Sequence, residues 1–206
     1  MSQYICIHPQ NPQGRLLQQA VNMINQGGVI VYPTDSGYSL ACHLGDKKAL
    51  ERIRQIRRLK EDHLFTLVCR DLSELSLYAK VDNPSFRLLK NYTPGPYTFL
   101  LPATKEVPRR LLHPNRKTVG LHIPETMIAA ALLEELGQPL MSTSLSLPDS
   151  DIPLIEPEAI KEILGHQVDL IIDGGYCGQK PSTVIDLSSS HPKVIRIGNG
   201  DPTPFL

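Results

Sequence analysis

One stretch near the start of the chain constrains the fold more than any other: G-G-V-I-V-Y-P-T-D-S-G-Y-S-L-A-C, residues 27–42. The apolar, β-branched run at 29–32 is typical of a buried strand. We expect it to end at Pro33, because proline lacks the N–H that a central ladder requires. Residues 34–37 carry turn chemistry, and a second strand is predicted at 38–43. The turn is either an ordinary hairpin or the polar rim of an α/β sheet.

The rest of the chain predicts helices and strands in mixed order. Helices are indicated where a capping residue precedes apolar residues at helical spacing, and strands where short apolar runs stand between turn residues. Because some predicted strands follow one another without a helix, we expect the α/β class with a mixed sheet, in one domain spanning 1–206. Helices are predicted to begin at Asn11-Pro12, Asp46, Asp71, Asn83-Pro84, Glu125 and Glu158, and strands to span 65–69, 97–101, 118–123, 140–145, 168–172, 183–186 and 194–197, the last near a sheet edge.

Composition narrows the class of protein. The 206 residues are 41% hydrophobic with a formal net charge of zero, which allows a sizeable core and gives no overall argument for a nucleic-acid or membrane protein. No apolar run approaches the roughly 20 residues of a membrane span, and the N-terminus does not resemble a secretory signal. The four cysteines are scattered without a C-x-x-C pair, which argues against structural zinc. A cytoplasmic protein with reduced thiols is predicted.

A first candidate binding group is the I-R-R-L-K end of the helix predicted after residue 46. At about 100° per residue, Arg57 falls between Leu50 and Ile53 in the apolar stripe. Two interpretations stay open for Arg58 and Lys60. They are either cations favoured at a helix C-terminus or part of a clamp for phosphate or carboxylate groups.

Hydroxyl and glycine residues form two further candidates. Ser142, Thr143 and Ser144 end a predicted buried strand, where they either donate to phosphate oxygens or bond to backbone and solvent. The segment G-G-Y-C-G-Q-K-P-S-T at 174–183 is either a backbone nest for an anion, with Ser182 adding a hydroxyl, or a plain glycine-rich connection. It lacks the G-K-[ST] order of a Walker loop.

The remaining candidates are a histidine and a basic run. His122 on its predicted strand titrates near neutrality, although a lone histidine is more often a hydrogen-bonded structural group. Arg109, Arg110, Arg116 and Lys117 form a local basic excess that either contacts phosphate backbones or is simply solvated. No motif here indicates a covalent nucleophile or a two-metal site.

Taken together, these stretches resemble the YrdC family. Y-P-T-D-S-G-Y-S-L is similar to the family's opening Y-P-T-E-T-x-Y-G-L. It is followed in family order by T-P-G-P-Y-T-F-L, P-L-M-S-T-S, V-D-L-I-I-D-G-G and P-S-T-V-I-D-L. The motifs H-x-F-T-L-x-C-R-D-L, K-E-V-P-R-R-L-L and G-G-Y-x-G-Q-K-P-[ST]-T-V-I-D-L are similar to the YciO branch of that family.

This resemblance implies a twisted mixed sheet with a concave basic face. The family's enzymatic branch joins L-threonine, bicarbonate and ATP, with Mg²⁺, into threonylcarbamoyl-adenylate and pyrophosphate, for a tRNA modification beside the anticodon. Carried onto this sequence, the resemblance implies threonine contacts by Thr34, His63 and His122. It implies ATP or phosphate contacts by Arg57, Arg58, Lys60, Ser142, Thr143, Ser144, Ser182 and Thr183.

The sequence departs from the enzymatic branch at its cations and amide. In the register of the following strand, the family's K-x-R falls on Arg57 and Leu59; a one-residue shift would use Arg58 and Lys60. The family's S-x-N becomes Ser144-Leu145-Ser146, and its strand Arg becomes His122. We therefore expect binding of nucleotide phosphates or of structured or double-stranded RNA such as tRNA, with absent or weak adenylate formation. The alternative is an L-threonylcarbamoyladenylate synthase. RNA contacts are predicted for Arg57, Arg58, Lys60, Arg109, Arg110, Arg116 and Lys117.

Overall fold

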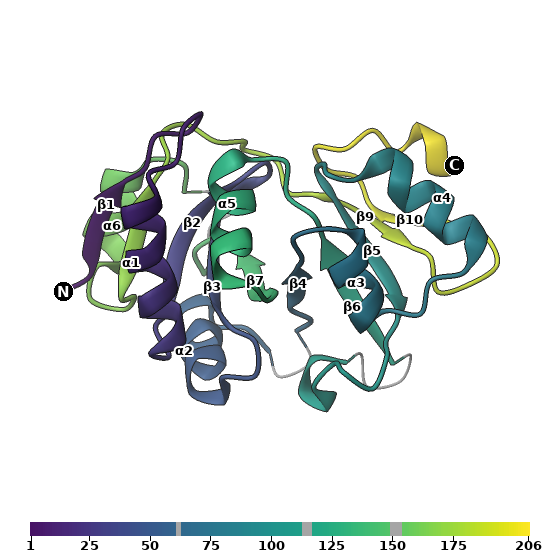
Figure 1. Cartoon of the computed structure of the whole chain (residues 1–206), viewed down its shortest axis with the longest axis horizontal. Helices are drawn as coiled ribbons and strands as arrows, with labels where there is room; N and C mark the ends of the chain where they lie inside the picture. Colours follow the sequence, from purple (N-terminus) through teal and green to yellow (C-terminus); the bar gives the residue numbers. More distant parts are fainter. Residues whose placement is uncertain (61–62, 113–116, 149–153) are drawn as a thin grey trace.

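The computed structural model describes residues 1–60, 63–112, 117–148 and 154–206, and in them ten strands form one continuous sheet (Figure 1). Most strands lie within two residues of their predicted bounds. In chain order they are β1 (Gln3–Cys6), β2 (Ile30–Thr34), β3 (Gly37–His43), β4 (Thr66–Val68), β5 (Tyr97–Pro102), β6 (Thr118–His122), β7 (Leu140–Ser144), β8 (Leu170–Asp173), β9 (Thr183–Asp186) and β10 (Lys193–Arg196).

The sheet is mixed, as predicted. Its strand order is β1-β8-β2-β3-β7-β4-β6-β5-β9-β10, so β10 lies at an edge as expected. The pairs β1–β8, β2–β8, β4–β6 and β5–β9 are parallel, and the other neighbours are antiparallel. The opposite edge strand, β1, was not predicted. Only Ile5 of its four residues is buried, so the strand carries no clear apolar pattern.

Pro33 does not end its strand, contrary to the prediction. β2 continues to Thr34, and Pro33 pairs with Tyr38 of β3. The other neighbour, β8, pairs with β2 only at Ile30 and Val31. Beyond Val31 the strand is therefore flanked on one side only, so the missing N–H costs no ladder bond on the open side.

Two predicted helix caps, Asp46 and Asp71, are observed. The Asp46 side chain accepts from the N–H groups of Lys48 and Ala49, and the Asp71 side chain accepts from that of Glu74. The cap expected at Asn11 is absent, because the first helix begins at Gly14 and its N-cap residue makes no side-chain cap bond. Described helices are α1 (Gly14–Asn25), α2 (Lys47–Arg57), α3 (Leu72–Tyr78), α4 (Asn83–Tyr92), α5 (Met127–Leu136), α6 (Pro157–Leu164) and the 3₁₀ turns η1 (Arg109–Leu111) and η2 (Thr203–Phe205).

Two apolar clusters lie on opposite faces of the sheet. On one face, α1 and α5 pack over alternate residues of one half of the sheet, such as Ile30 of β2 and Ala41 of β3. The other face carries a larger cluster that runs from Val31 and Leu40 to Phe99, Leu121 and Ile185. Figure 1 shows α1 and α5 side by side over β2, β3 and β7. Among the described residues, no buried residue of β5, β6, β9 or β10 belongs to the α1–α5 cluster.

In the part of the chain that the structure describes, no helix has the length and hydropathy needed to cross a membrane.

Candidate functional site

A cavity of about 270 Å³ lies on the same sheet face as α1 and α5, over the part of that face that the two helices leave uncovered. Because side chains alternate along a strand, the apolar core takes Phe99 and Leu121, while their neighbours face the cavity. The strand residues that line it are Tyr32, Thr34, Ser39, Thr66, Val68, Thr98, Leu100, Gly120, His122, Ser142, Thr143, Ser144, Val184 and Arg196.

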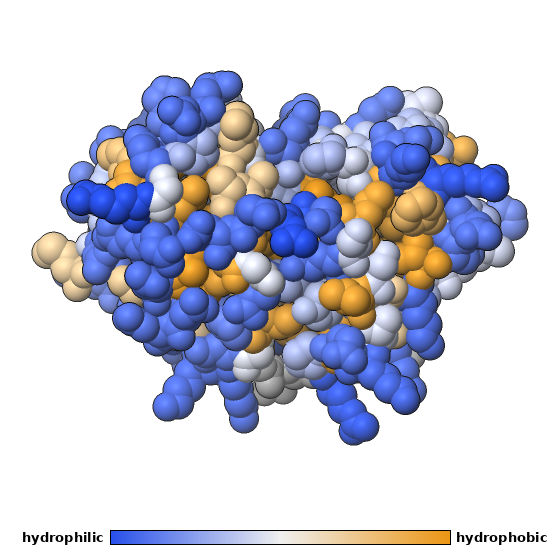
Figure 2. Space-filling view, in the orientation of Figure 1, coloured by the Kyte–Doolittle hydropathy of each residue, from blue (hydrophilic) through white to orange (hydrophobic). Residues whose placement is uncertain are grey.

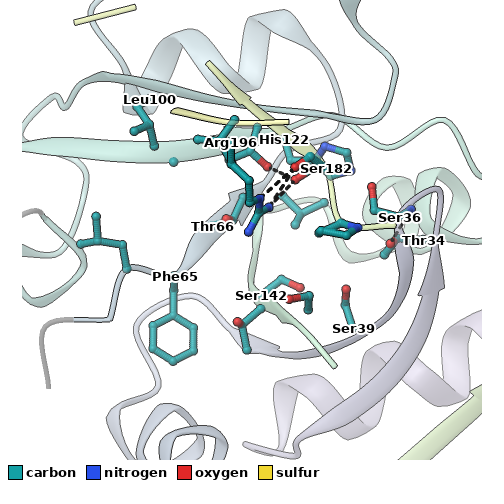
Figure 3. Close-up of a pocket in the computed structure, with 18 of the residues that line it drawn as sticks. Thr34, Ser36, Ser39, Phe65, Thr66, Leu100, His122, Ser142, Ser182 and Arg196 are labelled. Atoms are coloured by element: carbon teal, nitrogen blue, oxygen red, sulfur yellow. Dashed lines mark hydrogen bonds between the residues drawn. The ribbon is translucent and has the colours of Figure 1, made fainter. Parts of the chain in front are cut away.

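The lining is rich in hydroxyl groups. The Tyr32 hydroxyl lies 3.1 Å from Ser142 Oγ, which in turn donates to the Leu40 carbonyl at 3.0 Å. On another wall, Thr98 Oγ1 and Ser182 Oγ are 2.7 Å apart. Figure 3 shows Ser142 and Ser39 on the opposite side of the hollow from Ser182. Such groups offer both donors and acceptors to a polar ligand.

Arg57 brings a cation to this hydroxyl wall from the end of α2. Its Nη1 donates to Thr143 Oγ1 at 3.3 Å and to the Ser144 carbonyl. Its Nε is buried and has no hydrogen-bond partner among the described residues. Burial lowers the pKa of the guanidinium, which nevertheless stays charged at neutral pH. The predicted position of Arg57 inside the apolar stripe explains this partial burial.

A second guanidinium reaches the cavity from β10. Arg196 donates to the Ser182 carbonyl from Nη2 at 2.9 Å and from Nε at 3.2 Å, and Nη2 is 3.4 Å from Ser182 Oγ (Figure 3). The cavity is therefore lined largely by hydroxyls, with the Arg196 guanidinium in its lining and the Arg57 guanidinium bonded to two lining residues, Thr143 and Ser144. This arrangement suits an anionic ligand that also carries hydrogen-bonding groups.

His122 faces two acceptors. Its Nδ1 lies 2.7 Å from the Tyr97 carbonyl, and its Nε2 lies 3.1 Å from Oδ1 of Asp35. Both side chains are 8% exposed. Burial by itself lowers the pKa of His122, but the hydrogen bond and charge of Asp35, together with the Tyr97 carbonyl, outweigh it and raise the pKa.

The structure brings most of the predicted site residues together. Seven of them line one cavity: Thr34, His63, His122, Ser142, Thr143, Ser144 and Ser182. Arg57 contacts two of these, and His63 Nε2 is 3.2 Å from Thr143 Oγ1. The Thr34 hydroxyl is engaged within its own turn, since it donates to the Gly37 carbonyl at 2.6 Å.

Other predicted residues lie away from the cavity. Thr183 is fully buried, and its hydroxyl donates to the Gly200 carbonyl at 2.5 Å. Arg58, Lys60, Arg109 and Lys117 are exposed. Arg116 and the side chain of Arg110 lie outside the described residues.

The glycine-rich segment packs against the β2–β3 turn. A Cβ on Gly178 would lie 2.6 Å from the Asp35 carbonyl oxygen, and one on Gly37 would lie 2.9 Å from that of Gly178. Of the two interpretations of this segment, the structure supports a connection whose glycines permit close backbone contact. Gly174 N–H donates to the Tyr38 hydroxyl at 3.2 Å.

Sequence reasoning did not predict several lining residues, among them Tyr32, Ser36, Ser39, Thr66, Thr98, Gly120 and Arg196. A signal was present in the strands. Thr66, Thr98 and Gly120 interrupt apolar runs in their strands, and all three line the cavity. A hydroxyl or a glycine where a buried residue is expected indicates a face without a covering helix.

The lining offers no carboxylate ligand for Mg²⁺. Among the described residues, no group of three or more His, Cys, Asp or Glu side chains could hold a metal ion. Mg²⁺ in nucleotide sites keeps several waters and uses phosphate oxygens besides one or two carboxylates. The described residues do not form such a site on their own.

The model of the family described as "Telomere recombination", which covers Sua5, YciO and YrdC proteins, matches residues 22–198. The chain belongs to this family. It is 62% identical over 206 residues to YciO of Escherichia coli K12, with both chains covered completely. The crystal structure of E. coli YciO matches it with a TM-score of 0.96, again over the whole of both chains. These matches confirm the predicted fold and the YciO branch.

The descriptions of two further relatives mention threonine or a threonyl group. A threonylcarbamoyl-AMP synthase of Chromobacterium violaceum is 33% identical over 182 residues, which are 88% of this chain and 93% of that protein. The crystal structure of P. abyssi Sua5 complexed with L-threonine is 26% identical and has a TM-score of 0.86, covering 95% of this chain and 57% of that one. Proteins named as threonylcarbamoyl-AMP synthases are thus distant relatives of this chain.

Proposed function

We propose that this protein binds ATP by its phosphate groups in the hydroxyl-lined cavity and forms threonylcarbamoyl-adenylate from L-threonine and bicarbonate only weakly. The observation that carries this proposal is the contact of Arg57 with Thr143 and the Ser144 carbonyl. It places a partly buried guanidinium, whose Nε has no hydrogen-bond partner among the described residues, against two residues of the cavity lining. Guanidinium groups bind phosphate through two parallel hydrogen bonds, which gives both affinity and orientation.

The roles of the residues follow from chemistry at the α-phosphate. A carbamate oxygen forms a new bond to the α-phosphorus of ATP. The bond from that phosphorus to the bridging oxygen breaks, and pyrophosphate leaves with its electron pair. The protein contributes by aligning these groups and by offsetting the charge on the phosphate oxygens. Arg57, Arg196 and the serine hydroxyls can do both. The relative named as a threonylcarbamoyl-AMP synthase supports this choice of substrates.

Weak activity is proposed because groups of the enzymatic signatures are missing. Leu59 is apolar and packs against the main core cluster, so it supplies no cation. Leu145 and Ser146 follow Ser144, and no amide stands there. His122 replaces the signature Arg, and both of its nitrogens face protein acceptors. Losing one preorganised donor typically costs about 10²–10³ in rate.

The test measures ATP binding and turnover in the same protein. We expect ATP binding by isothermal titration, and pyrophosphate release that requires both L-threonine and bicarbonate. Arg57→Ala should weaken ATP binding by roughly 10–100-fold, as expected for hydrogen bonds to charged groups of about 1.5–3 kcal/mol. Arg15→Ala, on the exposed surface of α1, is the matched control. Unchanged ATP affinity in Arg57→Ala would contradict the proposal.

RNA binding is the second candidate, supported by a different surface. Figure 1 places the end of α2 and the segment around η1 along the same lower edge, and Figure 2 shows long hydrophilic side chains projecting from it. Arg58, Lys60, Arg109 and Lys117 are the exposed cations of these segments. A basic edge of this kind suits the phosphate backbone of a duplex.

Fluorescence anisotropy with a double-stranded RNA tests this second candidate. Replacing any one of these four cations with Ala should weaken binding by a similar factor for every RNA sequence. It should also reduce the slope of log affinity against log salt concentration by about one. Arg87→Ala and Lys90→Ala, exposed on α4, serve as controls. If RNA affinity depends neither on salt concentration nor on the four substitutions, this edge does not bind RNA.

A further inference from the structure

Asp35 connects the turn between β2 and β3 to β6, which carries the cavity residue His122. Asp35 Oδ1 lies 3.1 Å from His122 Nε2 on β6, and its Oδ2 accepts from the Glu125 N–H at 3.3 Å. The Asp35 carbonyl also accepts from Asn199 Nδ2 at 3.3 Å. One residue thus connects the turn to three segments that lie 87 to 164 positions away in sequence.

The partners of His122 determine its charge. A backbone carbonyl and a carboxylate are acceptors, so each ring nitrogen must carry a proton to make both bonds. The raised pKa of His122 favours the imidazolium, which can donate to both the Tyr97 carbonyl and Asp35. Neither N–H remains to donate to a ligand, so the cation of His122 holds protein segments together. The family resemblance, by contrast, implies a threonine contact by His122.

The turn carries cavity residues. Thr34 and Ser36 both line the cavity, and the Ser36 N–H donates to Thr34 Oγ1 at 3.2 Å. Ser36 Oγ is buried and has no hydrogen-bond partner among the described residues, as expected for a group that meets a ligand or water. Figure 3 shows Thr34 and Ser36 together at one end of the cavity, on the side of the turn.

We propose that Asp35 is a positioning residue: through an imidazolium at His122 it fixes the Thr34–Gly37 turn against β6, and the cavity loses ligand affinity when His122 is deprotonated. The inference rests on the proposed ATP binding. When the Nε2 proton is lost, the hydrogen bond to Asp35 is lost with it, and the buried carboxylate faces a lone pair. The turn then loses its bond to β6 while those to Glu125 and Asn199 remain, so Thr34 and Ser36 are held less firmly.

Other charged groups lie near the Asp35–His122 pair, and their effect on binding must be distinguished from that of His122. His63 and Arg196 line the same cavity, and Glu125 belongs to the segment whose N–H bonds to Asp35. Tyr97 contributes only its carbonyl. His63 is the other titrating group near neutral pH in the lining, so His63→Gln is included among the variants.

The experiment measures Mg·ATP affinity from pH 6 to 9 by isothermal titration, alongside an NMR titration of the labelled His122 ring. Affinity of the unsubstituted protein should fall as pH rises, by up to about tenfold per pH unit because one proton is lost. His122→Arg keeps the positive charge, so its ATP affinity should not vary with pH, apart from the variation that the titration of ATP itself causes in every variant. Asp35→Asn should move the fall and the NMR midpoint to lower pH. His166→Gln, exposed on the surface, is the control.

Several outcomes overturn the proposal. One is a profile of His122→Arg that matches the unsubstituted protein, and another is a flat profile in His63→Gln. A third is an NMR midpoint that Asp35→Asn does not move. Because the pKa of His122 is raised in the folded state, its stabilisation is complete below about pH 6.5 and is lost as pH rises through the folded value. The melting temperature should follow the same curve without ATP. If no variant binds ATP, the proposed function falls, while the NMR and melting curves still decide whether the pair holds the turn.

Discussion

Two parts of the same sheet face differ in what they contact: one packs under helices, and the other lines a cavity. Under α1 and α5, the alternate strand residues are apolar and fully buried, as at Ile30 and Ala41. Over β5 and β6, the corresponding positions are Thr98 and Gly120, and they line a cavity. The other face is apolar beneath both parts. A sheet this wide can therefore leave part of one face without a helix, because the opposite face and the covered part supply the stability.

The largest expected effect lies in the covered part. Leu132 of α5 is fully buried in the cluster between α1, α5 and the sheet. Leu132→Ala removes methyl groups and leaves a cavity, so the free energy of unfolding should fall by about 2–5 kcal/mol. Urea denaturation measures it. Met127→Ala, on the same helix but 51% exposed, is the matched control and should change little. A loss well below that range in Leu132→Ala would mean that α5 contributes little to holding this face.

Substitutions in the uncovered part of the face should lower ATP affinity and leave the free energy of unfolding nearly unchanged. A Cβ at Gly120 would meet Thr98 Cγ2, Leu100 Cδ2 and Thr66 Oγ1 at 3.4–3.5 Å, which is ordinary contact. Gly120→Ala should therefore fold normally, and Gly120→Val should place two methyl groups in the cavity. We expect ATP affinity to fall stepwise, by about tenfold or 1.4 kcal/mol for the Val variant. Unfolding and titration are measured on the same samples. Unchanged affinity in Gly120→Val would show that the ligand does not reach this part of the cavity.

Much of the secondary structure could be predicted because its signals are local. Asp46 and Asp71 each bond to backbone N–H groups two or three residues away, so the chain segment alone indicates the start of the helix. The predicted start at Asn11 was wrong, since the helix begins at Gly14 without a side-chain cap. Arg57 was correctly placed in the apolar stripe, because helical spacing alone gives its direction.

The cavity could be predicted only in part because strand order decides which residues meet. Asp35 and His122 are 87 positions apart, and Thr98 meets Ser182 across 84. Alternation shows that Thr98 and Leu100 share a face, but it does not tell which face the helices cover. Arg196 lies in the last strand and reaches the site because β9 and β10 follow β5 in the sheet. The resemblance supplied Thr34 and Ser182 where the local pattern left alternatives open.

The smallest expected effect gives the most direct comparison of the two parts. Ser39 and Ala41 lie on the same face of β3, two residues apart, and one faces the cavity while the other lies beneath the helices. Ser39→Ala should change the free energy of unfolding by less than about 0.5 kcal/mol, because it removes a hydroxyl that lines an existing cavity and opens no new void in the core. It should lower ATP affinity by a few-fold. The reciprocal Ala41→Ser buries a hydroxyl among apolar side chains and should cost about 1–3 kcal/mol of stability with no separate effect on binding. If both variants lost stability equally, the two positions would be equivalent, and the uncovered part of the face would be core like the rest.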